Sequence, residues 1–256
     1  MSIVFAVRGS NMTAYHAGGM GVPTSVGTVS ITSSTASGVI GGSYINLDQG
    51  ALGQHALYYN GLSNIPATQQ VSVLCRCATS TTASAAQMFY FGLPANIGGN
   101  LARFGGNGVI PYTTTDLTGS TIVTLNETLA AVQNQFYDFF WSCDFSLTTN
   151  NFIAWRDNTA VGTASTSVTR AIVTPQYGSI VALGSQNAAA QSTTQLYLNE
   201  FVIWDTIINP TTVSLTTGSG LNGSARTAFV QVSNSVGGSG TTIRGRPALG
   251  PPNQLV

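Results

Sequence analysis

The hydrophobic residues of this chain recur in short runs or at every second position, and long stripes at helical spacing are absent. The clearest alternation runs from Phe136 to Phe145. One face of this predicted strand carries Tyr137, Phe139, Trp141, Cys143 and Phe145. The other face carries Asp138, Ser142 and Asp144, with Phe140 as an exception. Alternation of this length indicates a strand with one face in a core.

A second pattern lies between Tyr177 and Pro210, where a short apolar run ends in Gly184 and a longer one extends from about Gln195 to Trp204. Both runs are bounded by turn residues and are rich in β-branched and aromatic residues, which favours strands. In the longer strand both faces are apolar, and one of them carries Leu198, Val202 and Trp204 beside Glu200. Only one face of a strand in a two-layer sandwich belongs to the core, so a loop, an arm or another molecule must cover the outer face. We predict an assembly surface there, at Leu198, Val202 and Trp204.

Further short β-type runs, a hairpin over residues 152–163 with its turn at Asp157-Asn158, and Gly-rich connections fill the chain. Many short strands with almost no helix predict an all-β fold, an antiparallel sandwich or barrel. We expect an extended N-terminal arm over 1–24, the β-sandwich over 25–215, and a C-terminal strand and arm over 216–256. The Gly/Ser/Pro-rich tail cannot build a core of its own.

Charge is scarce: Asp, Glu, Lys and Arg make up 6% of the chain against about 25% in an average protein. Eight arginines balance eight acidic residues, lysine is absent, and 43% of residues are hydrophobic. This composition excludes disorder and the concentrated basic face that nucleic-acid binding needs. We find no apolar run long enough for a membrane span and no signal peptide. So few charges suggest a surface that partners cover.

Three cysteines are present. Cys75 and Cys77 are two residues apart on a predicted strand, about 7 Å, which is at the limit for a disulfide bond. We therefore expect free thiols that face the core, no metal site, and synthesis in a reducing cytoplasm.

Three segments, taken in order, resemble the concanavalin A-like lectin/glucanase superfamily, in particular its laminin-G-like members. They are the aromatic strand 136–144, the hairpin 151–163, and the closing element 180–205. The resemblance covers about three quarters of the chain and implies a jelly-roll sandwich of two curved antiparallel sheets. It does not by itself imply sugar binding, because one fold hosts many functions.

Enzymatic activity is not expected. Glycosidases place two carboxylates on either side of one bond, about 5 Å apart in retaining enzymes. The glutamates here are Glu127 and Glu200 alone, and Asp205 would lie on the opposite strand face from Glu200. We interpret Glu200 as a structural acid bonded to backbone or to an arginine, and Asp144 and Asp157 as turn residues rather than calcium ligands. No catalytic residue, metal or cofactor is predicted.

Two functions fit these observations. The first is a virion structural protein, most simply a bacteriophage head-decoration (cement) protein that binds major capsid or other virion proteins and forms a homo-oligomer; it would be made in the host cytoplasm and reside in the virion. The alternative is a carbohydrate-binding tail or fibre protein, with a glycan as partner. Its candidate sugar-stacking residues are Tyr58, Tyr59 and Tyr112, which also fit core or turn positions.

Overall fold

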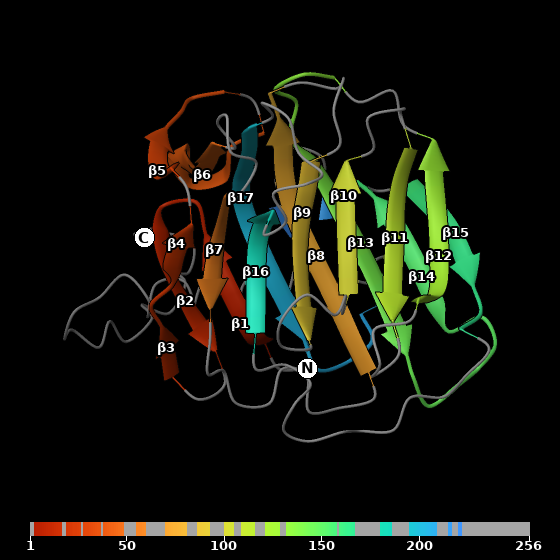
Figure 1. The fold of residues 1–256 in the computed structure, drawn as a ribbon. Helices are drawn as coiled ribbons and strands as arrows, with labels where there is room; N and C mark the ends of the chain where they lie inside the picture. Colours follow the sequence, from red (N-terminus) through yellow and green to blue (C-terminus); the bar gives the residue numbers. More distant parts are fainter. Residues whose placement is uncertain are drawn as a thin grey trace, which may run out of the picture.

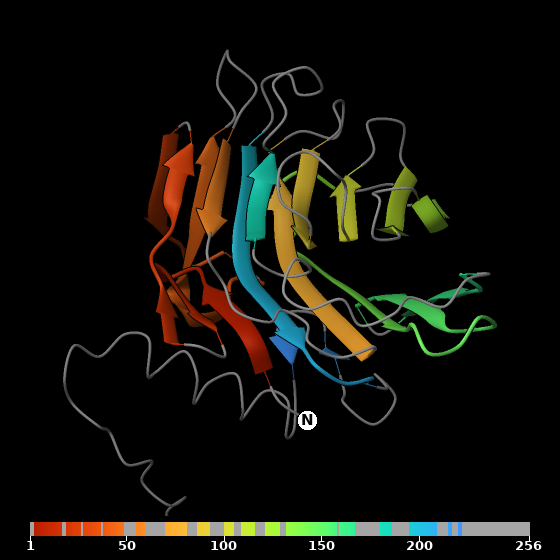
Figure 2. The same cartoon turned by 60° about the horizontal axis from the view of Figure 1, so that its bottom comes forward.

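The computed structural model contains two facing antiparallel β-sheets and confirms the predicted all-β sandwich (Figure 1). It describes residues 3–16, 19–26, 28–36, 38–48, 55–59, 70–80, 86–92, 100–104, 109–115, 121–128, 132–157, 159–166, 180–185, 195–208, 215–216 and 220–221. Figure 2 shows the two sheets as separate layers.

The larger sheet has ten strands. These are β1 (Ile3–Arg8), β2 (Asn11–His16), β3 (Gly19–Gly21), β5 (Thr28–Ser33), β6 (Ser43–Asp48), β8 (Gln70–Thr79), β13 (Tyr137–Asp144), β14 (Phe152–Arg156), β15 (Thr159–Ala164) and β17 (Gln195–Trp204). Its main order is β15-β14-β13-β8-β17-β1-β2-β3. The predicted hairpin is confirmed as β14 and β15, which pair antiparallel on either side of Asp157.

The smaller sheet has seven strands in the order β12-β11-β10-β9-β16-β7-β4. These are β4 (Thr24–Val26), β7 (His55–Tyr59), β9 (Ala86–Gly92), β10 (Asn100–Phe104), β11 (Val109–Thr115), β12 (Thr121–Thr128) and β16 (Ile180–Ser185). A separate two-stranded ladder joins β18 (Leu215–Thr216) to β19 (Gly220–Leu221). In the described part of the chain, no helix is long and apolar enough to cross a membrane.

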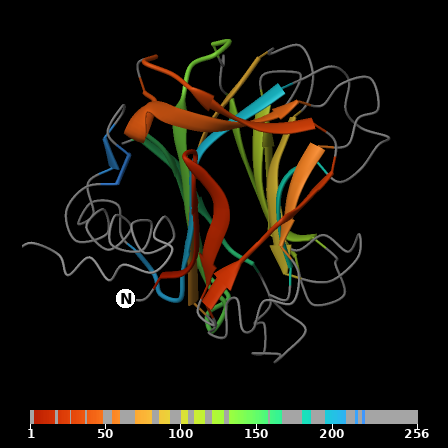
Figure 3. The ribbon, with the colours of Figure 1, turned by 90° about the vertical axis from the view of Figure 1, so that its left-hand side faces the viewer.

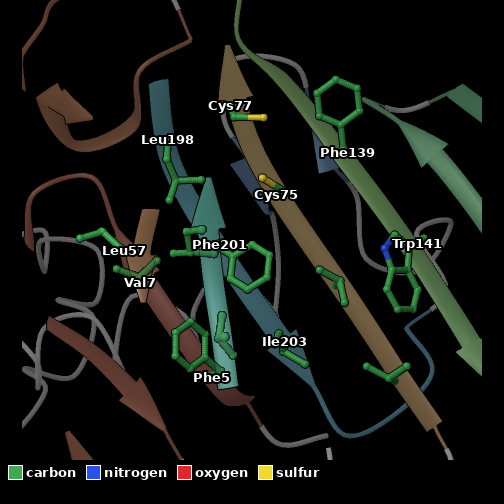
Figure 4. Packing of buried hydrophobic residues seen from close by; sticks show 14 of the residues in the cluster. Phe5, Val7, Leu57, Cys75, Cys77, Phe139, Trp141, Leu198, Phe201 and Ile203 are labelled. Atoms are coloured by element: carbon green, nitrogen blue, oxygen red, sulfur yellow. The ribbon is translucent and has the colours of Figure 1, made fainter. Parts of the chain in front are cut away.

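The core lies between the sheets, and the ten-stranded sheet supplies most of its described side chains (Figure 4). All five residues of the alternating face of β13 belong to the core cluster, as predicted. Cys75, Cys77 and Cys143 are buried there as free thiols, which confirms their expected orientation. Burial of large apolar side chains is the main favourable term in folding, about 25 cal/mol per Å² of apolar surface.

The N-terminal segment is part of this sheet, which corrects the prediction of an arm over residues 1–24. β1 pairs with β17 and buries Phe5 and Val7 in the core. β2 and β3 continue the sheet beyond β1. The sequence signal for β1 was its apolar run, which a paired strand explains better than an arm. The structure describes Leu215, Thr216, Gly220 and Leu221, and the rest of the predicted C-terminal segment 216–256 lies outside the described residues, so that segment stays a prediction.

Along one side, β17 pairs with β6 in its first half and with β1 in its second half, and Asn199 lies between the two pairings. β6 pairs with Gln195–Leu198, and β1 pairs with Glu200–Trp204. The Asn199 carbonyl accepts a hydrogen bond from Gly9 N–H at 2.7 Å, while its side-chain amide donates to the Ser43 carbonyl at 2.8 Å. A Cβ on Gly9 would lie 2.3 Å from the Ser43 oxygen, so only glycine fits this close approach.

The strands β5 and β6 form a hairpin at one end of the sandwich (Figures 1 and 3). They are joined by the 34–42 loop, of which all residues except 37 are described. This loop ends in the 3₁₀ turn η1 (Ile40–Gly42) and is closed by a hydrogen bond from Ser34 N–H to the Gly42 carbonyl.

Candidate ligand-binding surface

Six uncharged polar or aromatic side chains gather on the outer face of β5, β6 and β17. We call them the corner patch: Ser30, Thr32, Tyr44, Asn46, Gln195 and Tyr197. The register pairs Thr32 with Tyr44, and Asn46 with both Ser30 and Tyr197. Ile45 and Leu47 alternate with the patch residues of β6 and are fully buried core residues. Strand alternation therefore puts the patch on the side away from the core.

The patch is built around an aromatic cluster. The ring centroids of Tyr44 and Tyr197 are 4.9 Å apart, and Phe136 lies 5.8 Å from Tyr44. Both tyrosines are half-buried, whereas Phe136 is buried beneath them. The Tyr197 hydroxyl donates a 2.7 Å hydrogen bond to Gln195 Oε1. Half-buried tyrosines present an apolar ring and a polar tip to a ligand.

The patch also holds an unused hydrogen-bond acceptor. Asn46 Oδ1 is buried and has no hydrogen-bond partner among the described residues. Buried polar atoms are normally paired, so this oxygen lacks a donor. It has almost no exposed surface, so a ligand hydroxyl would reach it only after a side chain of the patch moves. The stacking surfaces, amides and hydroxyls of these six residues suit a hydroxyl-rich ligand. The register also places Asp48 of β6 opposite Gln195.

Next to the patch, four charged residues of alternating sign form a row across four strands. The strand register places Arg8 of β1 opposite Glu200 of β17, and Arg76 of β8 opposite both Glu200 and Asp138 of β13. Arg76 Nη1 lies 2.5 Å from Asp138 Oδ1, and Arg8 Nε lies 3.7 Å from Glu200 Oε1. The ion pair with Arg8 confirms the prediction that Glu200 is a structural acid.

Three more charged residues extend this row, first to the end of strand β14 and from there to strand β12 of the smaller sheet. Asp157 Oδ1 accepts a hydrogen bond from Asp138 N–H at 3.0 Å, and its Oδ2 lies 3.2 Å from Arg156 Nη1. Arg156 Nε in turn lies 2.6 Å from Glu127 Oε1 of β12. The Arg156–Glu127 pair therefore joins the two sheets. In this chain of eight arginines and eight acids, seven charged residues belong to one connected network.

The network carries four acids and three arginines, and the pKa of one of these acids, Asp138, is shifted upward. Burial raises the pKa of Asp138 to about 6; Arg76 opposes the rise, while Glu200 and Asp157 add to it. A buried carboxylate with this environment takes up a proton at mildly acidic pH.

The 34–42 loop lies over the charged row and links it to the corner patch. Arg76 Nε donates a 2.7 Å hydrogen bond to the Gly38 carbonyl. A Cβ on Gly41 would lie 3.2 Å from Arg8 Nη2, so the loop backbone also rests on that guanidinium. Gly38 and Gly41 have φ values of +92° and +76°, which favour glycine. The charged residues thus hold the loop that connects β5 to β6.

Each of the four carboxylates in the network contacts an arginine or accepts a hydrogen bond from a backbone N–H. Within the described ranges, no group of three or more His, Cys, Asp or Glu side chains could hold a metal ion. Asp144 and Asp157 are turn residues as predicted: Asp144 Oδ1 accepts from Ser146 N–H, and Asp157 has φ of +53°.

The tyrosines predicted as sugar-stacking loop residues lie on strands. Tyr59 of β7 is a core residue that contacts Phe5 edge-on, and its hydroxyl donates to the Met12 carbonyl. It is therefore unavailable to a ligand. Tyr58 also lies on β7, and Tyr112 lies on β11 opposite Leu125. Both side chains fall outside the described residues, so these two candidates stay predictions.

The residues predicted as an assembly surface are buried within the chain. Leu198 belongs to the core, because a register shift between Leu198 and Glu200 turns the two halves of β17 to different faces. Val202 and Trp204 lie on the opposite face and have no exposed surface. None of the three side chains is accessible at the surface. Because of the bulge at Asn199, Leu198 lies on the opposite face from Val202 and Trp204, so the prediction that the three share one face is wrong.

Sequence reasoning did not select Tyr44 and Tyr197 as ligand candidates. Tyr44 opens a short β-type run and alternates with Ile45, which is a detectable signal of an outward aromatic side chain. The proximity of Tyr44 to Tyr197 depends on the pairing of β6 with the first half of β17. That pairing joins residues far apart in the chain and leaves no local signal.

The fold resembles toxin receptor-binding domains. The structure matches the receptor-binding domain of botulinum neurotoxin C/D mosaic serotype with a TM-score of 0.62, and the binding domain of botulinum neurotoxin DC in complex with rat synaptotagmin II with 0.61. The same domain in complex with SialylT gives 0.59. Sequence identities are 10%, 9% and 9%, so the likeness concerns the fold alone.

Each match covers 82% of this chain but only 49–50% of the toxin domain, so the chain spans about half the length of those structures. No protein-family model matches the sequence, and no curated protein matches it significantly. These comparisons support the jelly-roll-like β-fold. They give no support to a concanavalin A-like family assignment or to a virion protein, which stay predictions.

Proposed function

We propose that this protein is a non-enzymatic binding domain that recognises a glycan at the corner patch. The carrying observation is the patch itself: two half-buried tyrosines 4.9 Å apart, with amides, hydroxyls and a spare acceptor around them. Its fold similarity to receptor-binding domains, one solved in complex with SialylT, adds support. The alternative function predicted from the sequence is thus favoured over head decoration.

Tyr44 and Tyr197 would stack on the face of a sugar ring, and Asn46 Oδ1 would accept a hydroxyl hydrogen bond. The 34–42 loop, fixed by Arg76 and Arg8, would hold Tyr44 in place beside the ligand. A surface with scarce charge would discriminate by hydrogen bonding and shape rather than by long-range attraction, so binding should depend little on salt.

The test is a glycan array that includes sialylated and neutral oligosaccharides, followed by titration of the best ligand. We expect Tyr44→Ala and Tyr197→Ala each to weaken binding roughly tenfold or more, about 1–2 kcal/mol. Leu147→Ala, an exposed residue of the β13–β14 turn, is the matched control and should bind normally. An array without signal for the folded wild-type chain would refute the proposal.

Assembly on a virus particle is a second candidate function. The observation in its favour is the low charge of the chain, seven of whose charged side chains pair internally and so leave the remaining surface still less charged. Gradient fractionation of particles from a host that produces them would test it. Recovery of the protein only as a free species would rule this candidate out, whereas glycan binding would be unaffected.

A further inference from the structure

The strand β5 is an unprotected sheet edge. In the part of the chain that the structure describes, it pairs with β6 on one side and with no strand on the other. The β5–β6 register is continuous over six residue pairs, without a bulge. Every residue of β5 is exposed or half-buried, and Ile31 is 45% exposed.

Natural proteins usually protect such edges with charged residues, proline, bulges or very short strands. The sequence of β5, Thr-Val-Ser-Ile-Thr-Ser, contains no charge and no proline. The edge strand β15 offers a comparison: its ladder with β14 has a register shift, which twists an edge away from further pairing. β3 and β4 are edges of only three residues each. The eight-residue edge β12 is longer, but its ladder with β11 has a register shift and it carries the charged residue Glu127. β5 is therefore the edge that is best suited to add a strand.

We propose that β5 pairs antiparallel with β5 of a second copy of this chain, across a two-fold axis at Ser30. In this register Ser30 faces its own symmetry mate, Val29 faces Ile31, and Thr28 faces Thr32. Residues directly opposite in an antiparallel pair share a face, so aliphatic side chains meet aliphatic ones and hydroxyls meet hydroxyls. Shifting the centre to Ile31 would instead place Val29 opposite Ser33.

The neighbouring strand supports the same register. Ile31 pairs with Ile45 of β6, and Val29 pairs with Leu47. The dimer would therefore contain a continuous apolar row, Ile45 and Ile31 of one copy followed by Val29 and Leu47 of the other. This row covers the exposed part of Ile31. The zero net formal charge of the chain adds no long-range repulsion between copies.

The dimer should be reversible and concentration-dependent, because one six-residue strand pair buries less than a standard interface of about 1,600 Å². It would also place two corner patches on one continuous outer surface, since Ser30 and Thr32 belong to both features. Dimerisation does not rest on glycan binding, and its test uses no ligand.

Site-directed cross-linking gives the sharpest test. Ser30→Cys places one thiol opposite its mate, whereas Thr32→Cys places it opposite Thr28 of the partner. The native cysteines in the described structure are buried and should not compete. Under mild oxidation we expect a covalent dimer with Ser30→Cys and much less with Thr32→Cys or with Thr163→Cys on the β15 edge. Equal cross-linking of all three variants would overturn the proposed register.

Analytical ultracentrifugation tests the association itself. The average mass of the wild type should rise towards that of a dimer with increasing concentration. Ser30→Lys puts two like charges at the axis and should remain monomeric with an unchanged melting temperature, since Ser30 is exposed. Thr163→Lys should dimerise like the wild type. A wild type that stays monomeric at its highest soluble concentration, or a Ser30→Lys variant that dimerises equally, would overturn the proposal.

Discussion

The ten-stranded sheet buries side chains on both of its faces, but with different chemistry. The inner face, with Phe5, Phe139 and Phe201, packs apolar side chains against the other sheet. The outer face buries Arg76, Asp138 and Glu200 in a row of alternating charges. Apolar packing tolerates any neighbour of suitable shape, whereas each buried charge needs a specific partner. The inner face thus provides stability, and the outer face fixes the position of the 34–42 loop.

The largest expected effect is on the inner face. Trp141→Ala should lower the free energy of unfolding by about 3–5 kcal/mol, because Trp141 is 1% exposed and its removal leaves a cavity beside Phe152. Urea unfolding followed by far-ultraviolet circular dichroism measures it. The control Leu147→Ala, at an exposed position, should stay within about 0.5 kcal/mol of the wild type. A small effect of Trp141→Ala would show that the two faces do not differ as proposed.

On the outer face, Asp138→Leu should cost about 3 kcal/mol, because it leaves the buried Arg76 guanidinium without its carboxylate. Arg76→Met combined with Asp138→Leu should recover most of that loss, since the remaining apolar pair needs no counter-charge. Chemical unfolding of both single variants and the double variant measures the coupling. Additive losses would show that Arg76 and Asp138 are not energetically coupled and would contradict the prediction.

The pH dependence should also distinguish the faces. The native pKa of Asp138, about 6, is above its ordinary value of 3.8, so the folded protein holds this proton more tightly than the unfolded chain. Asp138 therefore reduces stability as pH rises from about 4 to 6, by on the order of 2–3 kcal/mol, and makes no further change above that window.

Asp138→Asn should remove this slope. The difference between the wild type and Asp138→Asn in stability at each pH is the informative quantity, because other carboxyl groups titrate in both proteins. Burial raises the pKa of Asp144, but hydrogen bonds from Ser146 and Gln70 outweigh it and lower the pKa, so Asp144 acts in the opposite direction. Thermal unfolding between pH 4 and 7 measures both curves. Parallel curves for the wild type and Asp138→Asn would contradict the prediction.

The smallest effect concerns the loop that the outer face holds. Gly38→Ala should cost about 1–2 kcal/mol, because its φ is +92° and the new Cβ would lie 3.2 Å from Phe136 Cβ. Gly42→Ala is the matched control: its φ is +74°, but nothing lies within 4 Å. The two variants share the backbone strain, so a larger loss of melting temperature for Gly38→Ala isolates the contact with the sheet. Equal losses would place the loop away from Phe136.

Local patterns predicted the elements that alternate cleanly. The face of β13 from Tyr137 to Phe145 and the β14–β15 hairpin follow from period-two spacing and a turn at Asp157. β17 shows where the same reasoning fails. Its alternation was extended through Asn199 without a break, but the bulge there moves Leu198 into the core. The hydrophobic pattern does not reveal this bulge, because the bulge lies where β17 changes its partner from β6 to β1.

By itself the sequence determined the all-β class, the core face of the strand that begins at Tyr137, and the inward thiols, because these depend on residue type and local spacing. Tertiary structure alone decided that β1, β2 and β3 join the sheet, that Tyr44 meets Tyr197, and that seven charged residues form one network. Those features depend on which distant strands lie side by side. Backbone hydrogen bonds between strands are the same for almost any sequence, so only the packing of the whole chain selects the partners.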